Sequence, residues 1–223
     1  MLACLQQQNC NRGGVKIASE AQRAIEKTGF YVLNEPSVSN IIAFLSEIGE
    51  IVQETDVRIR QDAKTYVSSP NEVPFHNDHP KVKHIAWRCI EQDKNDGGSL
   101  LVDCKKLISN LEETMRSELA RVRLRCPELA SMVPSCEYPL YNHETGQVFW
   151  APWLLPAEVS LEQQAAIEFF SSQINSPSNH ERIRLKRNEV LLVDNHRIVH
   201  GRAALSKEST RHLKRYWLSP KAA

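Results

Sequence analysis

The sequence predicts a mainly β protein with flanking helices, built as an antiparallel sandwich or jelly roll with helices packed outside. Helix signals gather at the start of the chain, and short alternating segments separated by turn residues fill most of the remainder. The sequence lacks the glycine-rich dinucleotide fingerprint and the regular strand–helix alternation of Rossmann and TIM-barrel folds. With 223 residues and no linker-like segment, we expect one domain over residues 1–223, with residues 1–15 as a flexible N-terminal segment.

The first quarter of the chain carries two predicted helices with a strand between them. Apolar residues at helical spacing predict one helix over residues 16–28, which Gly29 ends, and another over residues 38–49. Residues 30–33 form a short apolar strand. The face of the first helix that we expect to be buried is formed by Ile17, Ala21, Ala24 and Ile25.

The rest of the chain is predicted to be strand and loop with two further helices. Period-two alternation or short apolar runs predict strands over residues 83–90, 99–102, 121–126, 189–194 and 211–217. A helix is expected over residues 105–119. Another opens at Ser160, where Gln163 stands in position for a capping box. Its expected buried positions are Ala165, Ala166, Phe169 and Phe170. Residues 127–156 are rich in Pro, Tyr and Trp and are expected to be loop with short strands.

Composition excludes several classes of protein. The 28 basic and 27 acidic residues leave a net charge of +1, which gives no general attraction to nucleic acid or to an anionic membrane. No apolar run approaches the roughly 20 residues that span a bilayer. The six cysteines contain no CxxC pair and are expected to be free thiols in a reducing compartment. The sequence therefore predicts a cytoplasmic protein.

The most informative local motif is VPFHNDHP at residues 73–80. In an extended backbone His76 and Asp78 project from the same face, so one nitrogen and one oxygen can reach the same ion. His79 offers a different spacing, HxxH, which we consider the weaker reading. Because a single HxD occurs often by chance, this motif alone favours a capped turn with a solvated carboxylate.

Two downstream motifs favour a functional site over a capped turn. DNHRIVHGR at residues 194–202 follows a buried apolar strand, as sites at the mouth of a barrel commonly do. RHLKRYW at residues 211–217 alternates, and its inward face is formed by Arg211, Leu213, Arg215 and Trp217. Buried arginines need anionic partners, and this strand has no alternating acidic side chains. A bound dicarboxylate or an anionic substrate is the expected partner.

Taken together, the three motifs point to a non-haem iron site. Two histidines and one carboxylate form the facial triad of Fe(II) oxygenases, which leaves three positions of an octahedral ion open. A 2-oxo acid chelates two of these positions, and dioxygen takes the third. An arginine deep in the barrel is well suited to hold the distal carboxylate of such a co-substrate with two parallel hydrogen bonds.

The ordered set HNDH, GGSLLVD, DNHRIVHGR and RHLKR resembles the Fe(II)/2-oxoglutarate-dependent oxygenases of the taurine dioxygenase and clavaminate synthase type. The resemblance runs from about residue 73 to residue 217, in the family's order. It implies a double-stranded β-helix, a jelly roll of cupin-like shape. It also implies that His76, Asp78 and His200 are the metal ligands and form the catalytic centre.

The same resemblance assigns the co-substrate site. It makes Arg211 the clamp for the C5 carboxylate of 2-oxoglutarate and places Arg215 where a substrate carboxylate is met. The family often has a threonine as the fourth residue of its Gly-Gly motif. Here Leu100 stands at that position and Ser99 precedes it, so Ser99 is the hydroxyl predicted beside 2-oxoglutarate.

The substrate pocket is less well defined by sequence. Tyr141 and Trp153 lie in the loop-rich segment and are predicted substrate contacts, although packing between loops and sheet explains them equally well. The chain is short for the family, which implies reduced covering loops. An open pocket, or a substrate presented on a carrier, would follow.

These observations lead to one principal hypothesis and two alternatives. The principal one is a dioxygenase that uses Fe(II), 2-oxoglutarate and O2 to hydroxylate an unactivated C–H bond. Its partner would be a small polar molecule, such as an amino acid or a natural-product intermediate, and succinate and CO2 would be released. The alternatives are a cupin-like metal-dependent hydrolase or isomerase, and a non-catalytic binding protein that retains the fold.

Overall fold

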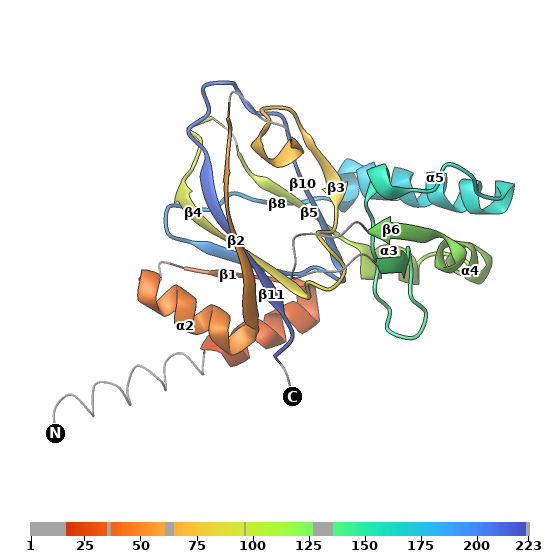
Figure 1. Cartoon of the computed structure of the whole chain (residues 1–223), viewed down its shortest axis with the longest axis horizontal. Coiled ribbons are helices and arrows are strands. Elements are labelled where there is room, and N and C mark those ends of the chain that lie inside the picture. Colours follow the sequence, from red (N-terminus) through yellow and green to blue (C-terminus); the bar gives the residue numbers. More distant parts are fainter. Residues whose placement is uncertain (1–16, 35–36, 61–64, 96, 127–135, 222–223) are drawn as a thin grey trace.

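The computed structural model describes residues 17–34, 37–60, 65–95, 97–126 and 136–221, and two antiparallel sheets form its centre (Figure 1). The first sheet has the order β1 (Phe30–Leu33), β9 (Val190–Asp194), β4 (His84–Glu91), β11 (His212–Ser219) and β2 (Glu50–Arg58). The second has the order β3 (Val73–His76), β10 (Ile198–Arg202), β5 (Ser99–Asp103) and β8 (Glu181–Ile183). Non-consecutive neighbours within each sheet confirm the predicted jelly roll.

The space between the two sheets is one apolar core. Its members share the inward faces of the strands and include Ile85, Trp87, Leu101, Leu191, Leu213 and Trp217. The period-two alternation read from residues 83–90 and 211–217 is thus confirmed, because every second side chain of β4 and β11 points to this core. One end of it opens into the functional site.

Two helices cover the outer face of the five-stranded sheet (Figure 1). The helix over residues 17–28 and α2 (Val38–Ile48) pack against it through apolar side chains that include Ala21, Ile25 and Ile41. The sheet contributes Ala86, Leu192 and Tyr216 to the same cluster. Gly29 ends the first helix with φ +84°, and a Cβ there would lie 2.5 Å from Cδ1 of Ile198. A glycine is therefore required for both conformation and space.

A third group of elements packs on the outer face of the four-stranded sheet (Figure 1). It consists of α3 (Cys104–Ser109), α4 (Glu113–Arg121), α5 (Leu161–Asn175) and the hairpin of β6 (Arg123–Cys126) and β7 (Cys136–Pro139). The predicted capping box at α5 is present: Ser160 and Gln163 bond each other's backbone N–H groups. The described residues also form three short 3₁₀ turns, η1 (Tyr66–Ser68), η3 (Pro152–Leu154) and η4 (Pro177–Asn179).

Several predictions about helices were wrong. The single helix expected over residues 105–119 is two helices, because the chain turns at Asn110 and Glu112 adopts an extended N-cap conformation before α4. In α5 the buried face is Ala166, Phe170 and Ile174, whereas Phe169 is 42% exposed and Ala165 is also exposed. In the first helix the buried face includes Ala18, whereas Ile17 lies at the surface.

Some predictions fall outside the described residues, including the flexible segment over residues 1–15 and part of the loop over residues 127–156. The strands β2, β3, β8 and β10 were not predicted. Within the described ranges, no helix is both long and apolar enough to cross a bilayer. Three cysteines there, Cys89, Cys104 and Cys126, are buried, and Cys89 and Cys104 are free thiols.

Candidate metal centre and co-substrate pocket

Two histidines face each other across neighbouring strands. His76 is the last residue of β3 and His200 is the middle residue of β10, and the two are direct partners in the antiparallel register. Both are buried, and their ring centroids lie 4.4 Å apart. Because directly opposed side chains on one face are the closest neighbours in an antiparallel pair, the sheet itself brings the imidazoles together.

Asp78 completes a group of three possible metal ligands. Taking one ligand atom from each of His76, Asp78 and His200, all three atoms lie within 4.8 Å of one another. Nδ1 of His76 is bound to the carbonyl of Pro74 at 2.8 Å, which leaves Nε2 to face Asp78 Oδ1 at 3.7 Å. This is the only such group of His, Cys, Asp and Glu found among the described residues, and it does not include His79.

Two buried asparagines hold the loop that carries Asp78. Asn77 donates from Nδ2 to the carbonyls of Asn195 (2.5 Å) and Ile198 (3.0 Å), and its Oδ1 accepts from the backbone N–H of Trp150 at 2.8 Å. Asn195 Oδ1 accepts from the N–H of Asp78 at 2.9 Å. Asn195 Nδ2 also donates to the carbonyl of Val82 at 2.8 Å, so this side chain has a role in the geometry of the loop. These bonds join chain segments between 73 and 121 residues apart and set the position of the carboxylate.

The carboxylate of Asp78 has two donors from β11. Nη1 of Arg215 donates to Oδ1 at 3.1 Å and to Oδ2 at 3.0 Å, and the indole N–H of Trp217 donates to Oδ2 at 2.8 Å. Burial opposes the charge, but the guanidinium of Arg215 outweighs it and holds the pKa of Asp78 well below its usual range. Asp78 is therefore ionised at neutral pH.

The protonation of the site suits a divalent metal ion. Burial, followed by the neighbouring His76, lowers the pKa of His200 to about 3, so its imidazole is neutral at pH 7 and available as a ligand. Nδ1 of His200 is buried and has no hydrogen-bond partner among the described residues. Two imidazoles and one carboxylate on one side of a cavity are the donor set of non-haem iron(II) oxygenases. These residues fit iron(II).

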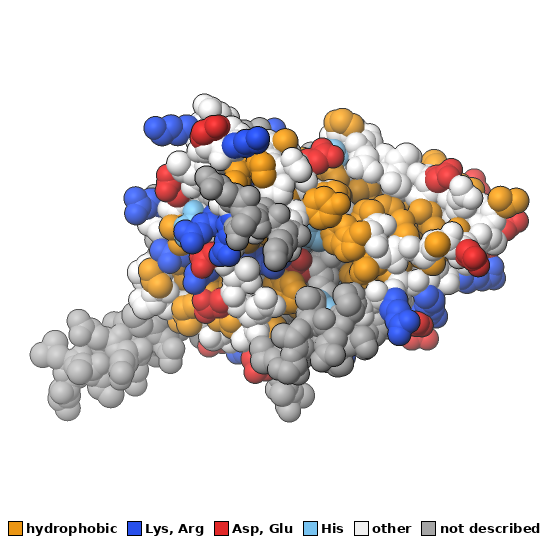
Figure 2. Space-filling view, turned by 45° about the horizontal axis from the view of Figure 1, so that its top comes forward, with side chains coloured by type: hydrophobic (Ala, Val, Ile, Leu, Met, Phe, Trp, Pro, Cys, Tyr) orange, Lys and Arg blue, Asp and Glu red, His pale blue; other side chains and the backbone are white. Residues whose placement is uncertain are grey.

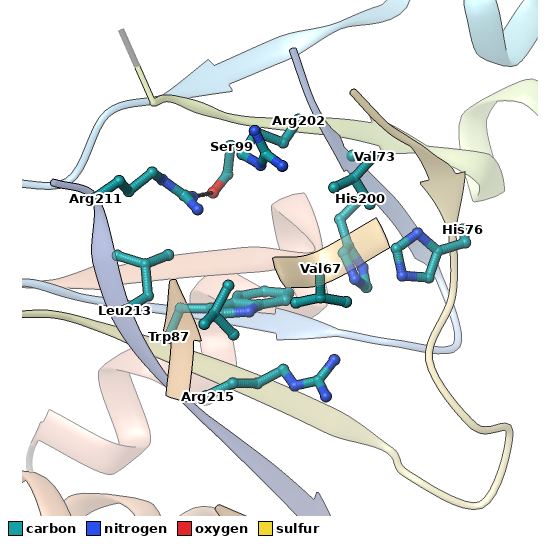
Figure 3. A pocket seen from close by; sticks show the side chains of 12 residues that line it. Val67, Val73, His76, Trp87, Ser99, His200, Arg202, Arg211, Leu213 and Arg215 are labelled. Carbon is teal, nitrogen blue, oxygen red and sulfur yellow. Dashed lines mark hydrogen bonds between the residues drawn. The ribbon is translucent and has the colours of Figure 1, made fainter. Parts of the chain in front are cut away.

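A narrow cavity of about 50 Å³ leads from the two histidines to Arg211 (Figure 3). Arg211 is buried; its Nε donates to the carbonyl of Gly97 at 2.7 Å and its Nη2 to Oγ of Ser99 at 3.3 Å. Gly97 has φ +97°, and a Cβ there would lie 2.9 Å from Cδ of Arg211. The structure thus brings Arg211 and Ser99 together at one end of the cavity, with His76 and His200 at the other.

A second cavity, of about 450 Å³, opens on the other side of the triad. Its lining is mostly apolar and includes Val73, Phe149, Trp153 and Leu154, with Arg215 and Asp78 on its inner wall. Tyr66 and Trp153 are stacked at 5.9 Å and are 52% and 49% exposed, and Trp153 lies 5.1 Å from the His76 ring. Figure 2 shows hydrophobic side chains gathered over the half of the molecule that carries β6, α4 and α5.

One predicted substrate contact occupies different surroundings from those expected. Tyr141 does not line either cavity at the triad; it lies beside His143 in a third cavity with Arg116 and His196. Arg202 also lines the narrow cavity, and it donates to the carbonyls of Ser69, Asn71 and Ala203, which ties the end of β10 to the segment before β3.

Sequence reasoning did not assign a role to Trp217 or to Asn77. Trp217 was placed on the inward face of its strand, which is correct, and its indole N–H was the available signal. An indole donor that points inward usually has a partner. Asn77 stands inside the HNDH motif, and a buried amide between two potential ligands was the corresponding signal.

Comparison with known proteins agrees with this geometry. Residues 14–217 match the model of the family described as taurine catabolism dioxygenase TauD, TfdA family. The match covers most of the chain, including all four motifs. No curated protein matches the sequence.

Solved structures share the fold at low sequence identity. An asparagine oxygenase in complex with Fe(II), 2S,3S-3-hydroxyasparagine and succinate aligns with a TM-score of 0.76 and 14% identity over 93% of this chain and 80% of that chain. A putative α-ketoglutarate-dependent taurine dioxygenase from Burkholderia xenovorans aligns with 0.70 and 18%, over 92% and 83%. The non-haem iron oxygenase OrfP with Fe, succinate and (3S)-hydroxy-L-Arg aligns with 0.71 and 15%, over 94% and 80%.

Proposed function

The chain belongs to the taurine catabolism dioxygenase TauD, TfdA family, and from this premise we propose that it hydroxylates an unactivated C–H bond of a small polar molecule. Enzymes of this family are Fe(II)- and 2-oxoglutarate-dependent oxygenases. The observation that carries the proposal is the convergence of His76, Asp78 and His200, whose ligand atoms lie within 4.8 Å of one another. When bound there, iron(II) with 2-oxoglutarate and O2 supplies the oxidising power, and succinate and CO2 are released.

The residues of this chain bind the metal ion and the co-substrate. We propose that His76, Asp78 and His200 hold the metal ion through two imidazoles and an ionised carboxylate. Arg211 is proposed to bind the distal carboxylate of 2-oxoglutarate, with Ser99 beside it, since both line the narrow cavity that begins at the histidines. A guanidinium in a buried cavity is suited to this role because it binds a carboxylate in two parallel hydrogen bonds.

The larger cavity is the proposed substrate site. Trp153 would cover the substrate from the rim, and Arg215 would meet a substrate carboxylate from the inner wall. Nε of Arg215 is buried without a partner among the described residues, which supports a further acceptor there. An amino acid or a natural-product intermediate, free or linked to a carrier, fits this combination. The buried free thiols of Cys89 and Cys104 support a reducing location, for which we propose the cytoplasm.

The test of this function is an anaerobic titration of the protein with Fe(II) and 2-oxoglutarate. We expect a weak visible charge-transfer band, and we expect Arg211→Ala to weaken 2-oxoglutarate binding by about 10²-fold or more because a buried charge pair is lost. Arg211→Lys should retain part of the affinity, and Arg121→Ala, on the exposed face of α4, should retain all of it. A wild-type protein without the band contradicts the proposal.

A second measurement identifies the substrate. Succinate release, screened across amino acids and carrier-linked compounds, should rise above the uncoupled background only with molecules that fit the larger cavity. A metal-dependent hydrolase or isomerase has no use for an anion clamp. In that case Arg211→Ala would leave turnover unchanged and no compound would stimulate succinate release.

A further inference from the structure

The two oxygens of Asp78 have different surroundings. Oδ2 accepts two hydrogen bonds, from Trp217 Nε1 at 2.8 Å and from Arg215 Nη1 at 3.0 Å. Oδ1 accepts one, from Arg215 Nη1 at 3.1 Å, and it is the oxygen that faces Nε2 of His76 at 3.7 Å. We propose that Trp217 is a positioning residue: its indole N–H occupies Oδ2, so that Oδ1 alone is presented to the metal ion.

The position of the indole is fixed by the sheet. Trp217 is 5% exposed and lies on β11, opposite Ile85 of β4 and Gln53 of β2. Arg215 stands two residues earlier on the same face, and its guanidinium carbon lies 5.0 Å from the centroid of the indole ring. Figure 3 shows Arg215 extending from β11 toward the two imidazoles. Both donors therefore approach Asp78 from one strand, β11.

One-oxygen binding by Asp78 has a chemical consequence. Two imidazoles and one carboxylate oxygen use three positions of an octahedral ion and leave three open. A carboxylate that bound through both oxygens would use a fourth position. Only two positions would then remain, which is the number that a chelating 2-oxo acid needs for itself. By reserving Oδ2, Trp217 keeps one more position available.

This inference rests on the proposed metal site and is tested by metal binding rather than by turnover. Trp217→Phe removes the N–H and retains a ring of similar shape. We expect its affinity for Mn(II), used as an air-stable probe, to fall about 10- to 100-fold, as is usual when the hydrogen-bond partner of a ligand is lost. Infrared spectra of Mn(II)-bound protein with ¹³C-labelled aspartate should show the wide separation of carboxylate stretches typical of one-oxygen binding, and this separation should narrow in Trp217→Phe.

Phe44→Leu is the control for core packing. Phe44 is also a buried aromatic residue, at 3% exposure, but it lies on α2 in the apolar cluster on the outer face of the first sheet, where its ring lies 6.4 Å from that of Tyr31. We expect this variant to bind Mn(II) with the affinity of the wild type, even though it also loses buried aromatic volume. A general effect of core packing would weaken both variants equally and would overturn the inference.

The outcomes separate this inference from the proposed function. A wild-type protein that binds neither Mn(II) nor Fe(II) refutes the proposed function. A wild-type protein that binds Mn(II) while Trp217→Phe shows the same affinity and the same carboxylate stretches refutes the role of Trp217 alone. If Trp217→Phe does not fold, the wild-type infrared spectrum decides: a narrow separation, typical of binding through both oxygens, overturns the inference.

Discussion

Two buried arginine–aspartate pairs in this molecule have nearly the same exposure and very different hydrogen bonding. In the pair at the end of the helix over residues 17–28, the side chains of Arg197 and Asp103 are 11% and 12% exposed. In the pair at the metal site, those of Arg215 and Asp78 are 11% and 9% exposed. The difference between the pairs therefore lies in their contacts and not in their burial.

Arg197 uses all of its donors within the protein. It meets Asp103 at 2.9 Å through Nε and at 2.6 Å through Nη2, and its remaining N–H groups reach the carbonyls of Ile25, Glu26 and Lys27. These carbonyls belong to the last turn of a helix, where Ile25 also accepts from the N–H of Gly29 at 2.8 Å and the final C=O groups lack partners within the helix. The first pair therefore has a structural role: it connects the end of the helix over residues 17–28 to the start of α3.

Arg215 leaves donor capacity unused. Its Nη1 serves both oxygens of Asp78, and its Nε is buried without a partner among the described residues. Because buried polar groups are nearly always paired, such an exception beside a cavity indicates a place for a ligand. In this molecule, the structural ion pair and the one at the functional site differ in how many guanidinium N–H groups have partners within the protein. They do not differ in burial.

The largest effect is expected from breaking the pair at the metal site, Arg215 and Asp78. Asp78→Ala removes a metal ligand, so we expect no measurable Mn(II) binding and a fall in substrate-dependent succinate release of about 10³-fold or more. The cost in stability should be small for a buried pair, because Arg215 borders the 450 Å³ cavity, where water can reach it. Mn(II) titration, succinate assays and urea unfolding measure the three quantities. Retained Mn(II) affinity would contradict the assignment of Asp78.

The matched change breaks the structural pair. Asp103→Ala removes the partner of Arg197 and also the N-cap of α3, which accepts from Lys105 N at 3.1 Å. We expect a loss of about 3 to 5 kcal/mol in the free energy of unfolding and no change in the Mn(II) affinity of the folded protein. Urea unfolding and Mn(II) titration below the transition check both. A similar loss of metal affinity in both variants would erase the distinction between the pairs.

A smaller effect concerns acid sensitivity, which we expect to arise outside both pairs. Burial lowers the pKa of His84, on β4, to about 4, although the nearby Asp194 acts in the opposite direction. A histidine with a depressed folded pKa contributes stability above its unfolded pKa of about 6.5 and loses it as the pH falls through 4. The free energy of unfolding should thus decrease by at most about 3 kcal/mol between pH 7 and pH 4.

The variant His84→Gln tests this assignment. Urea unfolding at several pH values should give a flatter profile than the wild type, since the variant has no proton to gain at this position. Part of the slope should remain, because burial also lowers the pKa of the neighbouring His196. An unchanged profile would place the acid sensitivity elsewhere, including in the ion pairs.

Much of the site was predictable from local pattern. The alternation of β11 correctly placed Arg215 and Trp217 on the inward face, and the HxD spacing correctly suggested that His76 and Asp78 reach the same point. The capping box at Ser160 was predictable for the same reason, since it depends on residues three positions apart. The division of the helix over residues 105–119 was missed because apolar spacing continues through the turn that separates α3 from α4.

The sequence by itself determined which residues share a face, where most helices and strands begin, and which types of side chain are available for a metal ion. Each of these depends on backbone geometry over a few residues. Only the tertiary structure decided that Asp78 pairs with Arg215, 137 positions away, that Trp217 donates to one of its oxygens, and that Tyr141 lies elsewhere. Those contacts follow from the register between strands and from how the loops fold back on the sheets, and these are set by the packing of the whole core.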